Sequence, residues 1–194
     1  VNIMPAPSEL AGAVLTGSHD MVTDEAPWSE ALAAWLRQAV KEELPIIGIC
    51  YGHQLLAHAL GGKVGYHPQG VEVGTHKVSI TDDAQQDPLF NALPKQFAVN
   101  LVHAQSVIEL PKGATLLAFN EHEHHQAYRF GKCAWGFQFH PAFSAAVMTG
   151  YFDNMQTKLE QRNIPWRELK EQVSETPESA TLLTRFAALT HSGQ

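Results

Sequence analysis

The sequence is poor in cysteine, in basic side chains and in long apolar runs, and each shortage excludes a class of protein. Two cysteines in 194 residues, Cys50 and Cys133, are too few for a fold held together by disulfides. Only 13 Lys and Arg stand against 20 Asp and Glu, and the formal net charge of −7 argues against nucleic acid or an anionic membrane as partner. No apolar run approaches the length that spans a membrane, and none resembles a secretory signal. We therefore expect a cytoplasmic protein.

What the sequence does contain is enough apolar material for one complete core. Hydrophobic residues make up 44% of the chain and charged residues 17%, a balance typical of a globular domain. We expect a single domain over residues 1–194, in which residues 165–194 form a helical tail that packs on the remainder.

The segment from Pro45 to Gly62 indicates a nucleophile at a sharp bend. A short apolar strand runs into Cys50, and a helical pattern follows that stops at two glycines. A turn from strand directly into helix lifts the residue at the bend clear of the sheet and offers it free backbone N–H groups. The positive end of the helix dipole should lower the pKa of a cysteine placed there. Gly48 and Gly52 suit a bend that is too tight for larger residues.

Cys50 has a second interpretation, because a lone cysteine after an apolar strand is most often a small buried side chain. The nucleophile interpretation gains support from the segment Ala134 to Ser144, an apolar and aromatic strand that delivers His140 directly before a proline. A cysteine and a histidine at the ends of two strands form a catalytic pair that a parallel sheet can bring together.

The residues of both segments resemble one protein family. The motifs GICYGHQLLAHALGG and WGFQFHP are similar to those of the class I glutamine amidotransferases, above all stand-alone proteins related to the amidotransferase domain of GMP synthetase. The resemblance covers about Ala11 to Tyr151. Family members place a glutamate two residues after the histidine, where this chain has Ala142, so the pair lacks its usual third member. The family also has a strand and a helix before the position of Val1, and we expect this domain to lack them.

The resemblance also implies roles for residues around the catalytic pair. It assigns the oxyanion donors to the backbone N–H groups of Tyr51 and Gly17, and Gly17 follows a short strand, at the sheet edge where ligands bind. A plain turn glycine is the alternative for that position. The family's substrate contacts correspond here to Ser18, Gln54, Ala104 and Gln105. The side chains at positions 104 and 105 differ from the usual ones, which leaves their backbone as the candidate contact.

Histidines outside these motifs raise the question of a metal site. Glu121 to His125 contains three histidines, but adjacent residues in a loop seldom point at one ion, so we expect an exposed loop and no metal. His53, His76 and His103 are expected to be structural polar residues.

These observations predict an α/β fold of flavodoxin-like layering, with a mostly parallel twisted sheet, helices on both faces and the site at the carboxyl ends of the strands. The resemblance implies a hydrolase in which Cys50 and His140 release ammonia from the glutamine side chain through a thioester, weakened by Ala142. It implies no cofactor, and a separate synthetase as a candidate acceptor of the ammonia. Two alternatives stay open: a γ-glutamyl peptide hydrolase with the same machinery, and a catalytically silent binding or regulatory module.

Overall fold

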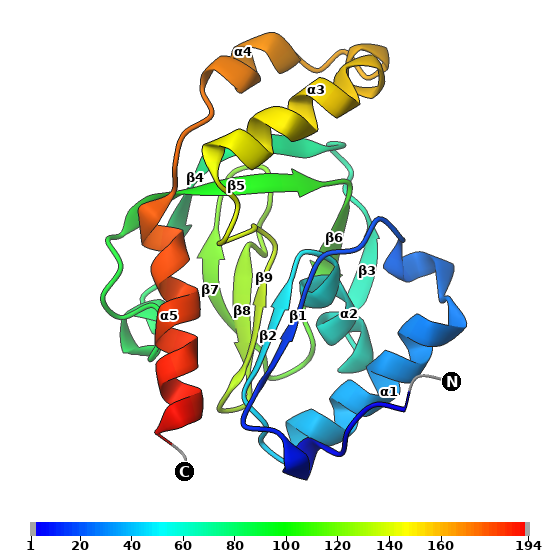
Figure 1. Ribbon diagram of the computed structural model, residues 1–194, viewed down its shortest axis with the longest axis vertical. Helices are drawn as coiled ribbons and strands as arrows, with labels where there is room; N and C mark the ends of the chain where they lie inside the picture. Colours follow the sequence, from blue (N-terminus) through cyan, green and yellow to red (C-terminus); the bar gives the residue numbers. More distant parts are fainter. Residues whose placement is uncertain (1–2, 193–194) are drawn as a thin grey trace.

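The computed structural model describes residues 3–192, which form a mixed sheet with helices on both of its faces (Figure 1). The strands are β1 (Ala13–Leu15), β2 (Ile46–Ile49), β3 (Lys63–Tyr66), β4 (Glu72–Ile80), β5 (Gln96–His103), β6 (Gln105–Glu109), β7 (Thr115–Phe119), β8 (Ala127–Phe130) and β9 (Ala134–Phe137). The α-helices are α1 (Pro27–Lys41), α2 (Tyr51–Ala59), α3 (Ala145–Gln161), α4 (Trp166–Glu171) and α5 (Pro177–His191), with short 3-10 helices at Pro7–Glu9, Val22–Asp24 and Asp83–Gln86.

The main sheet has the strand order β1-β2-β9-β8-β7-β4-β5 within the described residues, and β3 pairs with β6 in a separate ribbon. The α/β class with helices on both faces is confirmed, but the parallel part is limited to β1, β2 and β9. The remaining neighbours in this sheet pair antiparallel. The reason is chain length: β8 and β9 are joined by a three-residue turn, which closes a hairpin but is too short for the crossover that parallel strands need.

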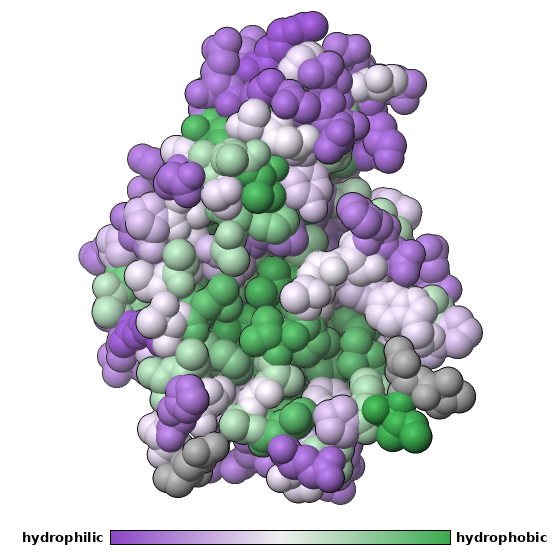
Figure 2. Space-filling view, in the orientation of Figure 1, coloured by the Kyte–Doolittle hydropathy of each residue, from purple (hydrophilic) through white to green (hydrophobic). Residues whose placement is uncertain are grey.

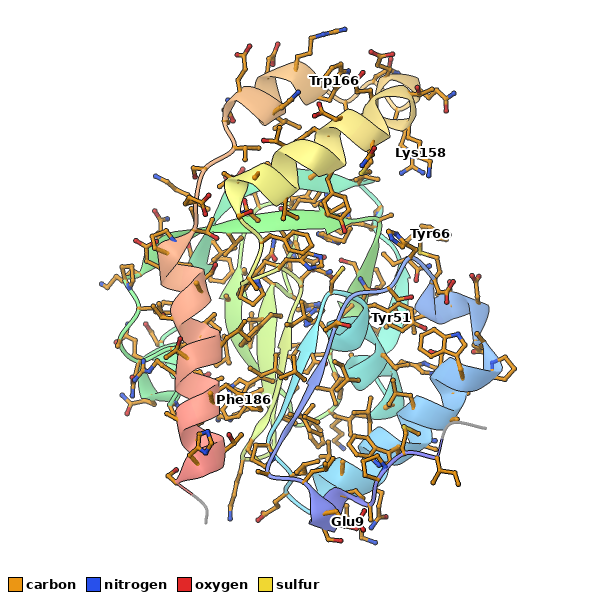
Figure 3. All side chains as sticks on the ribbon, in the orientation of Figure 1. Glu9, Tyr51, Tyr66, Lys158, Trp166 and Phe186 are labelled. Atoms are coloured by element: carbon orange, nitrogen blue, oxygen red, sulfur yellow. The ribbon has the colours of Figure 1, made fainter. Side chains whose placement is uncertain are left out.

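Alternating residues of the central strands build a core on each face of this sheet. Ile46 packs with the helix pair α1 and α2 on one face, whereas Ile47 packs on the other face with α5. Phe186 points from α5 toward the sheet, where its ring lies edge-on to Trp135 with centroids 6.1 Å apart (Figure 3). Because both faces of the main sheet are buried, the position and register of β2 and β9 are fixed. These two strands lead to Cys50 and His140, the catalytic candidates.

Helices α3 and α4 form a separate layer across β4 and β5 (Figure 1). A third apolar cluster joins them to the sheet through Val73 of β4, Met148 and Phe152 of α3, and Trp166 of α4. Ser144 caps the start of α3, where its hydroxyl accepts a hydrogen bond from the Val147 N–H at 3.2 Å. This layer places α3 beside the ends of β2 and β9.

Strand β1 lies at one edge of the main sheet, and apolar surface gathers there between α5 and α1 (Figure 2). Val14 of β1 is 49% exposed and Trp28 of α1 is 47% exposed. None of the described helices has both the length and the apolar character that crossing a membrane requires.

Candidate active site

Cys50 lies at the bend between β2 and α2 in a conformation that L-residues rarely adopt. Its backbone has φ 52° and ψ −103°, and it is the residue that precedes the first turn of α2. The bend is as tight as the sequence indicates. A Cβ atom at Gly48 would clash with the backbone of Gly52, and a Cβ atom at Gly52 would lie 2.6 Å from the carbonyl oxygen of Leu15. The chain therefore needs glycine on both sides of the cysteine, and the strain at Cys50 is of the kind found at functional sites.

The thiol of Cys50 is neutral at rest, which corrects the expectation of a lowered pKa. Part of the residue remains accessible, but burial of its sulfur raises the pKa to about 12. The backbone N–H of Tyr51 and the side-chain amide of Gln138 act in the opposite direction and do not offset the lost hydration. The sulfur accepts from Nε2 of Gln138 at 3.6 Å and donates to the carbonyl oxygen of Val102 at 3.7 Å. Burial by the surrounding protein therefore raises the pKa of Cys50 more than the start of α2 lowers it.

His140 reaches the same place from the end of β9, the parallel neighbour of β2. The residue is 9% exposed, and its backbone N–H donates to the carbonyl oxygen of Asn100 at 2.9 Å. Burial, with a smaller contribution from the charge of His103, lowers the pKa of His140 to about 4. At neutral pH the imidazole is therefore uncharged and able to accept a proton.

Cys50 and His140 line one cavity of about 370 Å³, together with Gly17 and Ser18 of the loop after β1. A Cβ atom at Gly17 would lie 3.2 Å from Cε1 of His140 and 3.9 Å from Cβ of Cys50. Gly17 thus lies close to both side chains, where a larger residue would crowd the imidazole. The structure contains no hydrogen bond between Cys50 and His140 among the described residues, since the thiol is directed to Val102. A direct contact between the pair stays a prediction.

The predicted substrate residues surround an adjoining cavity of about 450 Å³, which shares Ser18 and Cys50 with the first. Ser18, Gln54, Ala104 and Gln105 all line it. The hydroxyl of Ser18 accepts from the backbone N–H of Asp20 at 3.1 Å. The amide nitrogen of Gln54 donates to the carbonyl oxygen of Gln105 at 2.8 Å and to Oε1 of Gln138 at 3.0 Å. The amide nitrogen of Gln54 therefore holds the start of β6 in place.

Helix α3 closes this second cavity from the outer side. Tyr151, Asn154, Lys158 and Arg162 line the wall, and Lys158 projects from α3 in Figure 3. This wall could not be found from the sequence, because nothing in the helical pattern of α3 indicates which turn faces the site.

Two further polar groups support the site: Gln138, which the sequence did not single out, and His103, which was expected to be a structural polar residue. Gln138 is fully buried and links Gln54 to the sulfur of Cys50. A lone polar residue in an apolar strand was the available signal. His103 is buried against Glu72, with its Nε2 2.7 Å from the carboxylate and its Nδ1 2.8 Å from the carbonyl oxygen of Gln105. This pair raises the pKa of His103 against the effect of burial and fixes the loop that follows it.

The segment Glu121 to His125 is a loop, and Glu121 and His124 are exposed as the sequence indicated, but Glu123 is buried. Glu123 is only 2% exposed, and its carboxylate accepts from the backbone N–H of His125 at 2.9 Å. Burial raises the pKa of Glu123 to about 7. In the described part of the chain, no group of three or more His, Cys, Asp or Glu side chains is placed to hold a metal ion.

Comparison with known proteins gives consistent matches. The family described as "Glutamine amidotransferase class-I" matches residues 8–156. Gamma-glutamyl peptidase 5 of Arabidopsis thaliana is 28% identical over 146 residues, which are 74% of this chain and 58% of that protein. A subunit of the glutamine-hydrolysing GMP synthase of Methanococcus aeolicus is 31% identical over 137 residues, 70% of this chain and 66% of that protein. The chain thus spans no more than two thirds of either relative.

A solved structure shares the fold. The crystal structure of a glutamine amidotransferase from Thermotoga maritima matches with a TM-score of 0.75 and 25% sequence identity, over 91% of this chain and 77% of that chain.

Proposed function

This chain belongs to the class I glutamine amidotransferase family, and from that membership we propose that it hydrolyses the side-chain amide of glutamine through a thioester on Cys50. One observation carries the proposal. A cysteine at a strained strand-to-helix bend and a histidine after the neighbouring parallel strand open into one cavity, and Gly17 lies close to both. Covalent catalysis needs a nucleophile and a base that face one substrate cavity, and Cys50 and His140 meet this requirement.

The reaction begins from the neutral pair. As the sulfur of Cys50 bonds to the amide carbon, its proton passes to the uncharged imidazole of His140. The imidazolium then gives this proton to the departing nitrogen, which leaves as ammonia, and a glutamyl thioester remains. Water attacks the thioester while His140 takes up its proton, and glutamate and the free thiol are released. Each step conserves protons without a cofactor.

The backbone N–H groups of Tyr51 and Gly17 are assigned to the oxyanion of both tetrahedral intermediates. Tyr51 is the first residue of α2, so its N–H has no partner within the helix, and Gly17 lies against both reacting side chains. Removing one such donor typically costs about 10²–10³ in rate. The α-amino and α-carboxylate end of glutamine would occupy the second cavity, beside Ser18, Gln54 and the backbone of Ala104 and Gln105.

A γ-glutamyl peptide is the second candidate substrate, and Ala142 is the observation that favours it. Ala142 lines the same cavity as Cys50, so the space that a glutamate side chain would fill is continuous with the place where the leaving group departs. That space can hold a group larger than ammonia. The Arabidopsis relative is named for this activity. If ammonia is the product, a separate synthetase is the proposed acceptor, and the free thiol suits the reducing cytoplasm.

The absence of the family's glutamate should weaken the reaction without abolishing it. The carboxylate of such a triad orients the histidine and stabilises its charged form. With Ala142, both contributions of the carboxylate are absent. A silent binding or regulatory module is the alternative that this loss keeps open.

Hydrolysis of a small substrate panel tests the proposal. The panel contains glutamine, asparagine and several γ-glutamyl dipeptides, with glutamate release as the common readout for all but asparagine. We expect turnover of at least one γ-glutamyl compound, none of asparagine, loss of activity in Cys50→Ala and full activity in the matched control Cys133→Ala. No turnover of any substrate by the unsubstituted protein, or unchanged turnover in Cys50→Ala, would refute the proposal.

A further inference from the structure

His140 lies beside Cys50 in the cavity without a carboxylate to orient its ring. Among the described residues, neither ring nitrogen has a protein hydrogen-bond partner, and no acidic residue lines the cavity that it shares with Cys50. The titratable side chains that line this cavity with it are Cys50, His19 and Tyr151, and His103 acts on it from behind. An unsupported imidazole on a short side chain can rotate, and rotation would carry its base nitrogen away from the sulfur.

A neighbouring aromatic ring stacks on the face of the imidazole. The ring of Phe143 lies parallel to the imidazole, with centroids 3.9 Å apart and an interplanar angle of 6°. This is the shortest separation among the ring pairs in the part of the chain that the structure describes. Tyr151 of α3 also stacks on Phe143, with centroids 5.4 Å apart and an interplanar angle of 24°. Phe143 therefore contacts a ring that follows β9 and a ring of α3.

Buried groups hold the turn that carries His140 and Phe143. Asn100, which is 0% exposed, accepts from the backbone N–H of His140 at 2.9 Å and donates its side-chain N–H to the carbonyl oxygen of Phe143 at 3.0 Å. The hydroxyl of Thr75 donates to the side-chain oxygen of Asn100 at 2.6 Å. Phe143 also packs against the apolar cluster of α3 and α4. Both the turn that carries His140 and Phe143 and the ring of Phe143 itself are therefore held in place.

We propose that Phe143 is the positioning residue for His140 and takes over the orienting role of the absent triad carboxylate. This inference rests on the proposed hydrolytic function. The face of Phe143 blocks rotation of the imidazole and leaves both of its nitrogens free, one for the thiol proton and one for water. A ring face attracts a cation, so the stack also supports the imidazolium that forms during catalysis, although more weakly than a carboxylate does.

The stack and a carboxylate would serve the same purpose, so their effects should not be additive. Replacing Phe143 by leucine keeps an apolar side chain and removes the flat ring face. In the native background, Phe143→Leu should lower kcat about three- to tenfold with little change in KM, which is the range expected for loss of an aromatic pair. In the Ala142→Glu background the same substitution should cost less than about twofold, because the carboxylate then orients the ring. Phe119→Leu is the matched control, at a half-exposed ring remote from the cavity, and should leave kcat unchanged.

An NMR measurement detects the stacking of Phe143 on His140 and does not depend on enzyme activity. In protein with labelled histidine, the His140 ring protons should be shifted upfield by the stacked ring of Phe143, and this shift should vanish in Phe143→Leu. An equal loss of kcat in both backgrounds, or no loss in either, would overturn the proposal. If no variant turns over any substrate, the proposed function fails. The NMR signal then decides the positioning role alone, and an unshifted or unchanged signal would contradict it.

Discussion

Restoring an acid at position 142 should raise turnover and move the pH dependence of the reaction. In the native protein burial holds the pKa of His140 at about 4, and no carboxylate opposes that effect in the cavity. A carboxylate at about 4 Å from the imidazolium contributes about 1 kcal/mol in water and about 4 kcal/mol at a protein surface. Ala142 is exposed, so the lower part of this range applies. At 1.36 kcal/mol per pKa unit, the pKa of His140 should rise by about one unit in Ala142→Glu.

The same interaction stabilises the imidazolium in the transition state, so kcat should rise about tenfold. His140 must be uncharged to accept the thiol proton. Native activity should therefore fall as the pH drops through about 4, and in Ala142→Glu this acid limb should lie at higher pH. The assay is steady-state glutamate release, measured across acid and neutral pH on the substrate that the panel identifies. Ala142→Gln is the control of equal size without charge.

Two results would refute this reasoning. An equal gain in Ala142→Gln would show that side-chain volume matters rather than charge. An unchanged kcat and an unmoved acid limb in Ala142→Glu, with Cys50→Ala inactive, would show that His140 has no use for a carboxylate.

Three further outcomes follow from the structure. Iodoacetamide should label Cys50 slowly at neutral pH and faster toward its pKa of about 12, and labelling as fast as that of free cysteine would contradict its burial. Because the pKa of Glu123 is raised to about 7, the free energy of unfolding that it contributes is fully present below about pH 4.5 and declines as the pH rises through 7. Urea unfolding should therefore show that Glu123→Gln is more stable than the native protein by up to about 3 kcal/mol at alkaline pH. This gain should be absent at acid pH. An equal difference in stability at both pH values would contradict the raised pKa of Glu123. Gly48→Ala should lower the free energy of unfolding by about 1–3 kcal/mol, because its Cβ would clash with the backbone of Gly52, and an unchanged urea midpoint would rule out that clash.

Local chemistry explains which parts of the site were predictable from sequence. Gly48, Cys50 and Gly52 are close in the chain, so the tight bend is encoded within one short segment and its geometry is confirmed. His140 could be placed at the end of a strand because the apolar strand directly precedes it in the sequence. The roles of these residues in catalysis stay predictions.

The remaining features depend on contacts between distant segments. The pKa of Cys50 is set by burial among residues that include Val102 and Gln138. This burial raises the pKa more than the adjacent helix terminus lowers it. The stack of Phe143 on His140 needs the turn that Asn100 holds from another strand. Glu123 was expected in an exposed loop because its neighbours are polar, yet the fold buries its carboxylate. Burial of this kind cannot be inferred from residues adjacent in sequence.

Covalent trapping of Cys50 tests the central claim most directly. A glutamine analogue with a diazoketone in place of the side-chain amide presents an electrophilic carbon where the thiol should attack. Peptide mapping by mass spectrometry should find one adduct, on Cys50. The adduct should persist in Cys133→Ala, and excess glutamine or γ-glutamyl substrate should suppress it. An adduct on Cys133 alone, or no adduct on Cys50 at full occupancy of the analogue, would contradict the assignment of Cys50 as the nucleophile.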